Sequence, residues 1–460
     1  MTKNNSSNPD QTATSSDNEL EHLKKLNRTL QDEKRALERE NKALKRLVSS
    51  KRFRAATRVA ETYNHLFPLG TSRRRAINSV TSRAAASRAK SRAKKEADRL
   101  HEMKELAKGY DRIMVIDSIP YAIKLKQRPQ HLADEFAKLG YFVIYLEPNV
   151  PGLGIRKVSK NLVTISDYTF LRGLSQKHKY FLLPNTMALE FDHLKDIRSW
   201  GYELVYDYID EFHEDISGDL ALQLMIFNHL EEFQPRLAVV TATRLEEHLK
   251  KDLMGLCPVI MAANAVNVDH FNYQEQDDTV PADFTKIVDL GHPIIGFYGA
   301  LAPWIDFKLI NYVAEKHPDW EIVLIGMDYN GALSGLKPAD NIHHYDSKQY
   351  SELASYAKHF DCATIPFCVG EIAKATSPVK LFEYMAAGLP TVGTRDLFEC
   401  RGYDYVYLAE DYDDFVAKLE QAIKDRKNPD ARARLLEQAK DNTWAKRAAT
   451  IDTKLRELEN

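Results

Sequence analysis

Short apolar runs alternate with helix-periodic segments along most of this chain. In the C-terminal part the β-rich runs are 293–301, 321–327, 360–367 and 390–394. Before them, strand-like runs cover 111–117 and 141–149 and open the segments 203–215 and 237–251. Alternation of strands and helices is typical of α/β domains with parallel sheets. We therefore expect two such domains, over residues 111–275 and 290–440.

The first 110 residues follow a different pattern. Leu23, Leu30, Leu37 and Leu44 recur every seven residues, and the second heptad position holds Leu20, Asn27, Lys34, Asn41 and Val48. This pattern predicts a parallel two-stranded coiled coil over 18–50, and hence a homodimer. Residues 1–17 are polar, and we expect them to be disordered.

A basic helical or linker region is expected over 51–110, because residues 51–95 hold 13 Lys and Arg against one acidic residue, Glu61. Two interpretations stand: peripheral binding to an anionic membrane surface, or a solvated linker. We do not expect nucleic-acid binding, since a bZIP basic helix precedes its zipper and this one follows it.

Composition limits the class of protein. A hydrophobic content of 44% and a net charge of −2 describe a soluble globular protein, and the 350 residues from 111 to 460 suffice for two cores. The four Cys lack zinc or disulfide spacing, so neither metal nor cofactor is expected. Without a signal peptide or an 18-residue apolar run, a cytoplasmic protein is the simplest expectation, and the membrane's inner face is the alternative.

The candidate chemistry lies in EIAKATSPVKLFEYMAAGLPTV, residues 371–392. Ser377 and Pro378 are good N-cap and first-turn residues, so a helix should start near Pro378 and end before Gly388. Its free N–H groups attract a diphosphate, and Lys380 adds a positive charge. Glu383, on the same face, can accept both ribose hydroxyls. The alternative is an ordinary strand-turn-helix whose Lys and Glu face solvent.

The segment SPVKLFEYMAAGLPTV resembles the donor-site signature of retaining GT-B glycosyltransferases, close to family four and its cell-wall polysaccharide branch. RPQHLADEFAKLGYFVIYLEP, residues 128–148, resembles the same branch independently. The resemblance implies two Rossmann-like domains facing a cleft, with acceptor on the first and nucleotide-sugar donor on the second. It also implies that helix 441–460 packs back on the first domain.

Some donor-site positions match this family and others depart from it. Gly299 and Gly326 follow strands where backbone must approach phosphate. The family's first, sugar-facing Glu is replaced by Ala375, and Glu371 is the candidate substitute. The Arg that often follows Gly299 is also absent, so Lys380, helped by Lys308, would carry the diphosphate charge.

The first domain contributes further candidates. Arg128, at the start of a helix, is expected to clamp a phosphate bidentately. Asp207 and Asp210 are the acidic candidates for the sugar end of the cleft. For His131 we favour a structural role, as we do for a packed Trp304 and a helix-capping Asp306 in the second domain.

These observations predict a retaining, metal-independent, hexosyltransferase-like enzyme. It would move a sugar from a nucleotide-sugar to a cell-envelope glycan or lipid-linked acceptor, with Glu371, Lys380 and Asp210 as catalytic residues. Two alternatives remain: a weak or inactive GT-B scaffold subunit of a glycan-synthesis complex, and a GT-B enzyme of another reaction such as a nucleotide-sugar epimerase. The sugar, the base and the acceptor stay open.

Overall fold

The computed structural model describes residues 90, 94–147, 150, 154–187, 189–214, 216, 219–253, 255–275 and 278–459. The expected disordered start, the coiled coil and most of the basic segment lie outside these residues. Residues 99–460 form one compact unit. Within it residues 99–107 are helical, and Met103 and Ala107 are buried in the core. The core therefore begins before residue 111.

The first sheet has the strand order β3-β4-β2-β1-β5-β6-β7-β8. All its paired strands are parallel except β3 and β4. The strands are β1 (Arg112–Asp117), β2 (Phe142–Leu146), β3 (Arg156–Lys157), β4 (Leu162–Ile165), β5 (His178–Pro184), β6 (Glu203–Tyr208), β7 (Leu237–Val240) and β8 (Val259–Met261). The helical segments are α4 (Arg128–Lys138), η1 (Tyr168–Leu171), α5 (Phe191–Ser199), α6 (Leu220–Asn228), α7 (Leu230–Phe233) and α8 (Thr243–Leu253).

Both faces of this sheet are buried along most of its strands, which explains why residues 113–116 of β1 and all of β2 are apolar. In β1, Ile113 and Val115 belong to one core cluster, and Met114 and Ile116 belong to the cluster on the other face. This alternation follows from the two-residue period of a strand.

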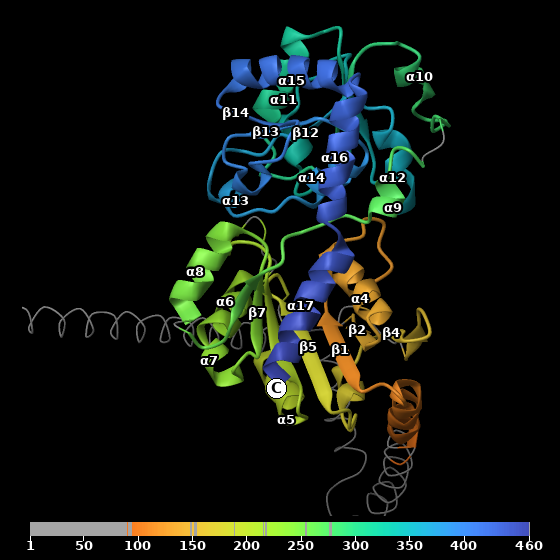
Figure 1. Ribbon diagram of the computed structural model, residues 1–460, viewed down its shortest axis with the longest axis vertical. Coiled ribbons are helices and arrows are strands. Elements are labelled where there is room, and N and C mark those ends of the chain that lie inside the picture. The colour runs from red at the N-terminus through yellow and green to blue at the C-terminus, as the bar shows by residue number, and fades with distance from the viewer. Residues whose placement is uncertain are drawn as a thin grey trace, which may run out of the picture. The chain divides into compact units, whose positions relative to one another are not determined.

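The second sheet is parallel throughout and has the order β11-β10-β9-β12-β13-β14. Its strands are β9 (Ile294–Tyr298), β10 (Glu321–Ile325), β11 (Ile342–Tyr345), β12 (Cys362–Ile365), β13 (Thr391–Thr394) and β14 (Val406–Ala409). The helical segments are α9 (Val268–Phe271), α10 (Thr285–Val288), α11 (Phe307–Lys316), η2 (Ala332–Gly335), α12 (Tyr350–Ala357), α13 (Glu371–Lys374), α14 (Val379–Ala386), η3 (Phe398–Cys400), α15 (Tyr412–Arg426) and α16 (Pro429–Asp441). Helices lie on both faces of this sheet (Figure 1).

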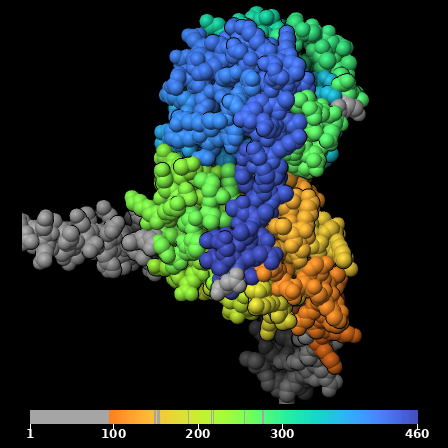
Figure 2. All heavy atoms as spheres, viewed as in Figure 1, coloured from red at the N-terminus to blue at the C-terminus, as the bar shows by residue number. Residues whose placement is uncertain are grey.

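The final helix, α17 (Trp444–Glu459), packs on the first sheet and not on the second. Trp444, Ala448, Ile451 and Leu455 lie along one of its faces and join the core cluster that contains Phe136 of α4. In Figure 2 the blue C-terminal helices lie over the first half between its green and orange segments. Among the described residues, no helix combines the length and apolarity needed to cross a bilayer.

Candidate functional site

The start of α14 is held by a buried pair of polar residues. Pro378 is the N-cap residue of α14, and no side chain caps the helix. The backbone N–H of Asn264 donates to Ser377 Oγ over 3.2 Å, and the Asn264 side-chain amide donates to Ser377 O over 2.6 Å. The prediction of Ser377 as the N-cap residue is therefore wrong by one residue, because the Ser377 hydroxyl accepts a hydrogen bond from Asn264 and does not cap the helix. The first-turn N–H groups of α14 stay without a side-chain cap.

Lys380 points back over the end of β9. Its Nζ lies 5.6 Å from the centre of the Phe297 ring. A Cβ on Gly299 would come within 2.1 Å of Lys380 Cε, and Gly299 has φ +144°. Burial lowers the pKa of the Lys380 amine, while Glu383 and Asp210 oppose that shift. Gly299 is thus required by the lysine stem that crosses it.

A glycine is required at position 326 because the backbone of Gly299 passes too close for a side chain. A Cβ there would lie 1.7 Å from the carbonyl oxygen of Gly299. The Gly299 N–H in turn donates to Ile325 O over 2.9 Å. The two glycines therefore let the loops after β9 and β10 run against each other beside Lys380.

Glu383 is buried one turn along α14 from Lys380, with 4% of its surface exposed. Burial raises the pKa of its carboxyl to about 7, and Lys380 and the Tyr298 hydroxyl act against that shift. The role of Glu383 as acceptor of the ribose hydroxyls stays a prediction. Glu383 therefore does not face solvent, as the alternative required, and the charge of Lys380 acts on its carboxyl group.

Arg128 does not present a free guanidinium. Its Nε and Nη2 each donate to one oxygen of Asp207 over 2.8 Å, and its Nη1 donates to Ala262 O over 2.8 Å. The side chain is almost fully buried. This geometry corrects the expectation of a diphosphate clamp: the bidentate fork of Arg128 is occupied by Asp207, and the pair fixes α4 to β6.

Asp210 is the acid that the first domain brings toward Lys380. The Asn185 side-chain amide donates to Asp210 O over 2.7 Å, and Asn185 Oδ1 accepts from Ile209 N over 2.8 Å. Burial raises the pKa of the Asp210 carboxyl to about 6, opposed by Arg128 and Lys380 and reinforced by Asp207. Asp210 and Lys380 therefore feel each other's charge although they come from different sheets.

Glu371 lies at the start of α13 and its side chain is 55% exposed. It forms ion pairs with Arg244 of α8 and, over 3.1 Å, with Lys374. These partners, Lys374 first, hold the pKa of its carboxyl below its usual range. Ala375 packs into the core cluster of the first sheet. The position of the family's first Glu is thus apolar, and Glu371 is tied to the first domain.

His131, Asp306 and Trp304, for which structural roles were predicted, make structural contacts. His131 stacks on Trp444, with ring centres 4.9 Å apart, and burial lowers its pKa well below the usual range. Asp306 caps α11 by accepting from Leu309 N over 3.0 Å. The Trp304 ring packs 5.9 Å from that of Tyr329.

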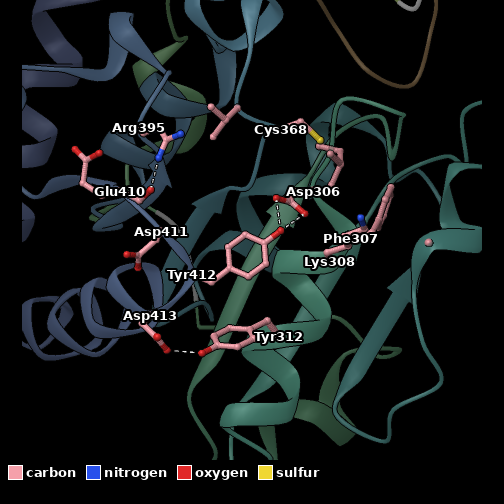
Figure 3. Close-up of a pocket in the computed structure, with 13 residues that line it drawn as sticks. Asp306, Phe307, Lys308, Tyr312, Cys368, Arg395, Glu410, Asp411, Tyr412 and Asp413 are labelled. Carbon is pink, nitrogen blue, oxygen red and sulfur yellow. Dashed lines mark hydrogen bonds between the residues drawn. The ribbon is translucent and has the colours of Figure 1, made fainter.

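An open pocket of about 1030 Å³ lies beside this helix cap (Figure 3). In it the Tyr412 hydroxyl donates to Asp306, with O–O distances of 2.9 and 3.0 Å. Its wall includes Lys308 but neither Lys380 nor Glu383. The pocket therefore does not contain the candidate donor residues of α14. Lys308, which was expected to help Lys380 with the diphosphate charge, lines this pocket, and Lys380 does not.

Sequence reasoning missed Asn264 and Arg244. Asn264 lies in the apolar stretch between the two domains, where a buried Asn signals a partner. Arg244 carried no such signal, because an Arg near the start of an amphipathic helix is ordinary. Each contacts the other domain near α13 or α14.

Comparisons with known proteins show what parts of this chain are similar to. Residues 292–425, which include Gly299, Lys380 and Glu383, match the family described as Glycosyl transferases group 1. A Bacillus subtilis (strain 168) protein named "Putative teichuronic acid biosynthesis glycosyltransferase TuaH" is 28% identical over 257 residues. That alignment covers 51% of this chain and 61% of the relative, so the chain matches about three fifths of the relative's length.

Solved structures with the same fold cover more of the chain. Sucrose-phosphate synthase from Thermosynechococcus elongatus has a TM-score of 0.56 at 13% identity, covering 75% of this chain and 99% of its own. A trehalose-6-phosphate protein from E. coli, bound with UDP-2-fluoro glucose, has 0.55 at 11%, covering 75% and 98%. Anabaena HepE, in complex with UDP and glucose, has 0.52 at 12%, covering 75% and 100%. The chain therefore has the GT-B fold, and its residues 292–425 match a family of glycosyltransferases.

Proposed function

We propose that this protein is a retaining, metal-independent glycosyltransferase that moves a hexose from a nucleotide-sugar to a cell-envelope glycan or lipid-linked acceptor. The observation that carries the proposal is the cluster of Lys380, Glu383 and Asp210 at the uncapped start of α14. Lys380 and Glu383 lie within residues 292–425, which match a glycosyltransferase family, and Asp210 comes from the first domain.

In this proposal the start of α14 binds the donor diphosphate. The backbone N–H groups of its first turn and the charge of Lys380 stabilise the negative charge that develops as the sugar–phosphate bond breaks. Glu383 accepts the ribose hydroxyls. Ser377, Pro378, Gly299 and Gly326 shape the backbone around these groups.

At the sugar end, Asp210 and Glu371 are the acidic side chains available. Asp210 is brought by the first domain and lies within electrostatic reach of Lys380. Glu371 would take the place of the family's first Glu, and its pairing with Arg244 couples its position to the first domain.

The relatives support the proposed donor and acceptor classes. Two of the structures with this fold are complexes with UDP or a UDP-sugar, so UDP-hexoses are the first donors to test. The name of the B. subtilis relative supports an envelope polymer as product. Homodimerisation through residues 18–50 and contact of the basic segment with anionic lipid remain parts of the same proposal.

A second candidate is a scaffold subunit without turnover. It is favoured by one specific observation: Ala375 fills the position of the family's first Glu, and Glu371 is occupied by ion pairs. Such a subunit would bind a nucleotide-sugar or nothing, and would recruit an active partner.

The first experiment is thermal unfolding of the full-length protein with UDP-, GDP-, dTDP- and CDP-sugars. A ligand at a hundred times its Kd stabilises the folded state by about 2.7 kcal/mol. We expect one nucleotide class to raise the Tm, and Glu383→Gln to remove most of that rise. Glu315→Gln, at an exposed carboxyl on α11 paired with Lys337, is the control and should respond as wild type. Equal responses of Glu383→Gln and wild type would place the ribose elsewhere.

A further inference from the structure

Asp117 is a buried carboxyl group without a hydrogen-bond partner. It is the last residue of β1 and has 1% of its surface exposed. Within the described residues, neither Oδ1 nor Oδ2 has a hydrogen-bond partner. It pairs in register with Leu146 on β2, and the alternation of β1 places it on the same face as Val115. Its surroundings on the strand are therefore apolar.

The other polar side chains at this edge of the sheet are paired. Glu147, just after β2, accepts from Arg156 over 3.0 Å and from Tyr121 N over 3.1 Å. Asn185, just after β5, both donates and accepts, and Thr241, just after β7, donates to Ile209 O over 2.6 Å. Asp117 is the exception among these four.

The topology of the sheet puts Asp117 where ligands commonly bind in folds of this kind. From β1 the chain goes to β2 on one side, continues through β3 and β4 on that same side, and then reaches β5 on the other side of β1. The strand order therefore changes direction between β1 and β5. In open parallel sheets, ligands bind beyond the carboxyl ends of the strands at this point of reversal. Asp117 stands at the carboxyl end of β1, at this point of reversal.

An unpaired buried carboxyl group destabilises the folded protein. Burial raises its pKa to about 7, so near neutral pH the folded chain keeps an acid that lacks the hydrogen bonds water would give it. A buried group left unsatisfied in a native fold calls for a partner that the chain itself does not supply. A hydroxylated ligand supplies such a partner.

We propose that Asp117 binds the acceptor sugar, by accepting hydrogen bonds from two of its hydroxyl groups. The proposal rests on the proposed function, in which the acceptor occupies the first domain. Two free carboxyl oxygens match a pair of neighbouring hydroxyls, and this contact selects acceptors that carry such a pair over deoxy analogues. No contact to the donor is involved.

The test uses the full-length protein and its Asp117→Asn variant, and the first readout is the Tm at pH 5.5 and pH 8. The pKa of Asp117 is raised in the folded state, so the folded chain binds more protons than the unfolded chain, and the carboxyl group destabilises it increasingly as pH rises toward 7. We expect Asp117→Asn to melt higher than wild type at pH 8, and by a smaller margin at pH 5.5. The control is Asp134→Asn, whose carboxyl accepts from Tyr121 and Lys126 and whose Tm should fall.

The second readout is the rate of nucleoside diphosphate release from a nucleotide-sugar, alone and with methyl glycosides of glucose, galactose and N-acetylglucosamine. We expect Asp117→Asn to lose the glycoside-stimulated rate at least about tenfold, the scale of one lost hydrogen-bonded contact, and to keep the donor-only rate within about twofold. An unchanged stimulated rate, or a lower Tm of Asp117→Asn at pH 8, overturns the proposal.

A wild-type protein that releases no diphosphate from any nucleotide-sugar counts against the proposed function and not against Asp117. In that case the same glycosides are tested by saturation-transfer NMR. Signals present with wild type and lost with Asp117→Asn support the sugar-binding role. Equal signals from both proteins, or none from either, overturn it.

Discussion

Burial changes what the charged residues of the candidate site do. Lys380 and Glu383 are three residues apart on α14 and would form a weak surface pair on an exposed helix. Inside the protein, burial raises the pKa of Glu383 to about 7 and lowers that of Lys380. A site with such groups responds to pH near neutrality and tolerates little change in the backbone around it.

Gly299→Ala should damage the donor site more than the substitution of a glycine normally does. The added Cβ meets the Lys380 stem at a backbone angle that L-residues rarely adopt, so Lys380 must move. We expect a lower Tm together with at least about tenfold weaker nucleotide-sugar binding, the loss that a displaced charge contact produces. Calorimetric titration checks it. Gly331→Ala, at φ +73° with nothing within 4 Å, is the control and should show backbone strain alone.

Nucleotide-sugar affinity should fall as pH drops below 7. Ribose hydroxyls donate to the ionised carboxylate, and Glu383 has a pKa of about 7, so binding requires the loss of one proton below that pH. The expected slope is about tenfold in Kd per pH unit between pH 5 and 6.5, since one proton is linked. Titrations with the nucleotide-sugar of highest affinity measure it. A Kd that is constant over this range contradicts the assignment.

Among the helices and strands, the sequence predicted those features that depend on residues close together in the chain. The Pro378 start and Gly388 end of α14 depend on neighbouring residues, and the helix was placed within one residue at either end. The role of Arg128 could not be predicted in this way, because its partner Asp207 lies 79 residues away. The N-cap role of Ser377 was predicted wrongly for the same reason, because the residue that its hydroxyl contacts, Asn264, is 113 residues away.

Arg128 and Asp207 should behave as a structural pair that joins α4 to β6. Arg128→Met leaves a buried carboxylate unpaired, which destabilises by about 3–5 kcal/mol. The double variant Arg128→Met/Asp207→Leu removes both charges and should recover most of that loss. Denaturant unfolding measures both. The double variant should also keep nucleotide-sugar affinity within about threefold; a folded double variant that cannot bind donor would restore Arg128 as a diphosphate ligand.

For the whole molecule, the alternation of strands and helices predicted the two-domain α/β fold, and the comparisons bear out GT-B. The electrostatic interaction of Asp210 with Lys380 could not be predicted from the sequence, because the two residues belong to different sheets. The heptad pattern of residues 18–50 lies outside the described residues and stays a prediction.

Deletion of residues 1–50 should convert a dimer into a monomer. The leucine heptads bury their apolar faces only against a second helix, so their removal leaves residues 51–460 without that contact. Light scattering gives the mass, and the Tm of the truncated chain checks that its domains still fold. A truncated chain that remains dimeric places the contact in the domains themselves.

The most direct measurement of the central claim is nucleoside diphosphate release by wild type, Lys380→Ala and Lys337→Ala in the presence of acceptor extract. A transferase that uses Lys380 on the departing diphosphate should lose about 10²–10³ in rate when that charge is removed, the scale of one preorganised electrostatic contact. Lys337→Ala, which removes an exposed lysine, should match wild type. The proposed transferase activity would be contradicted by rates of wild type and Lys380→Ala that agree within a factor of about three. It would also be contradicted by a wild type that binds a nucleotide-sugar and never releases diphosphate. Either result would favour the scaffold subunit.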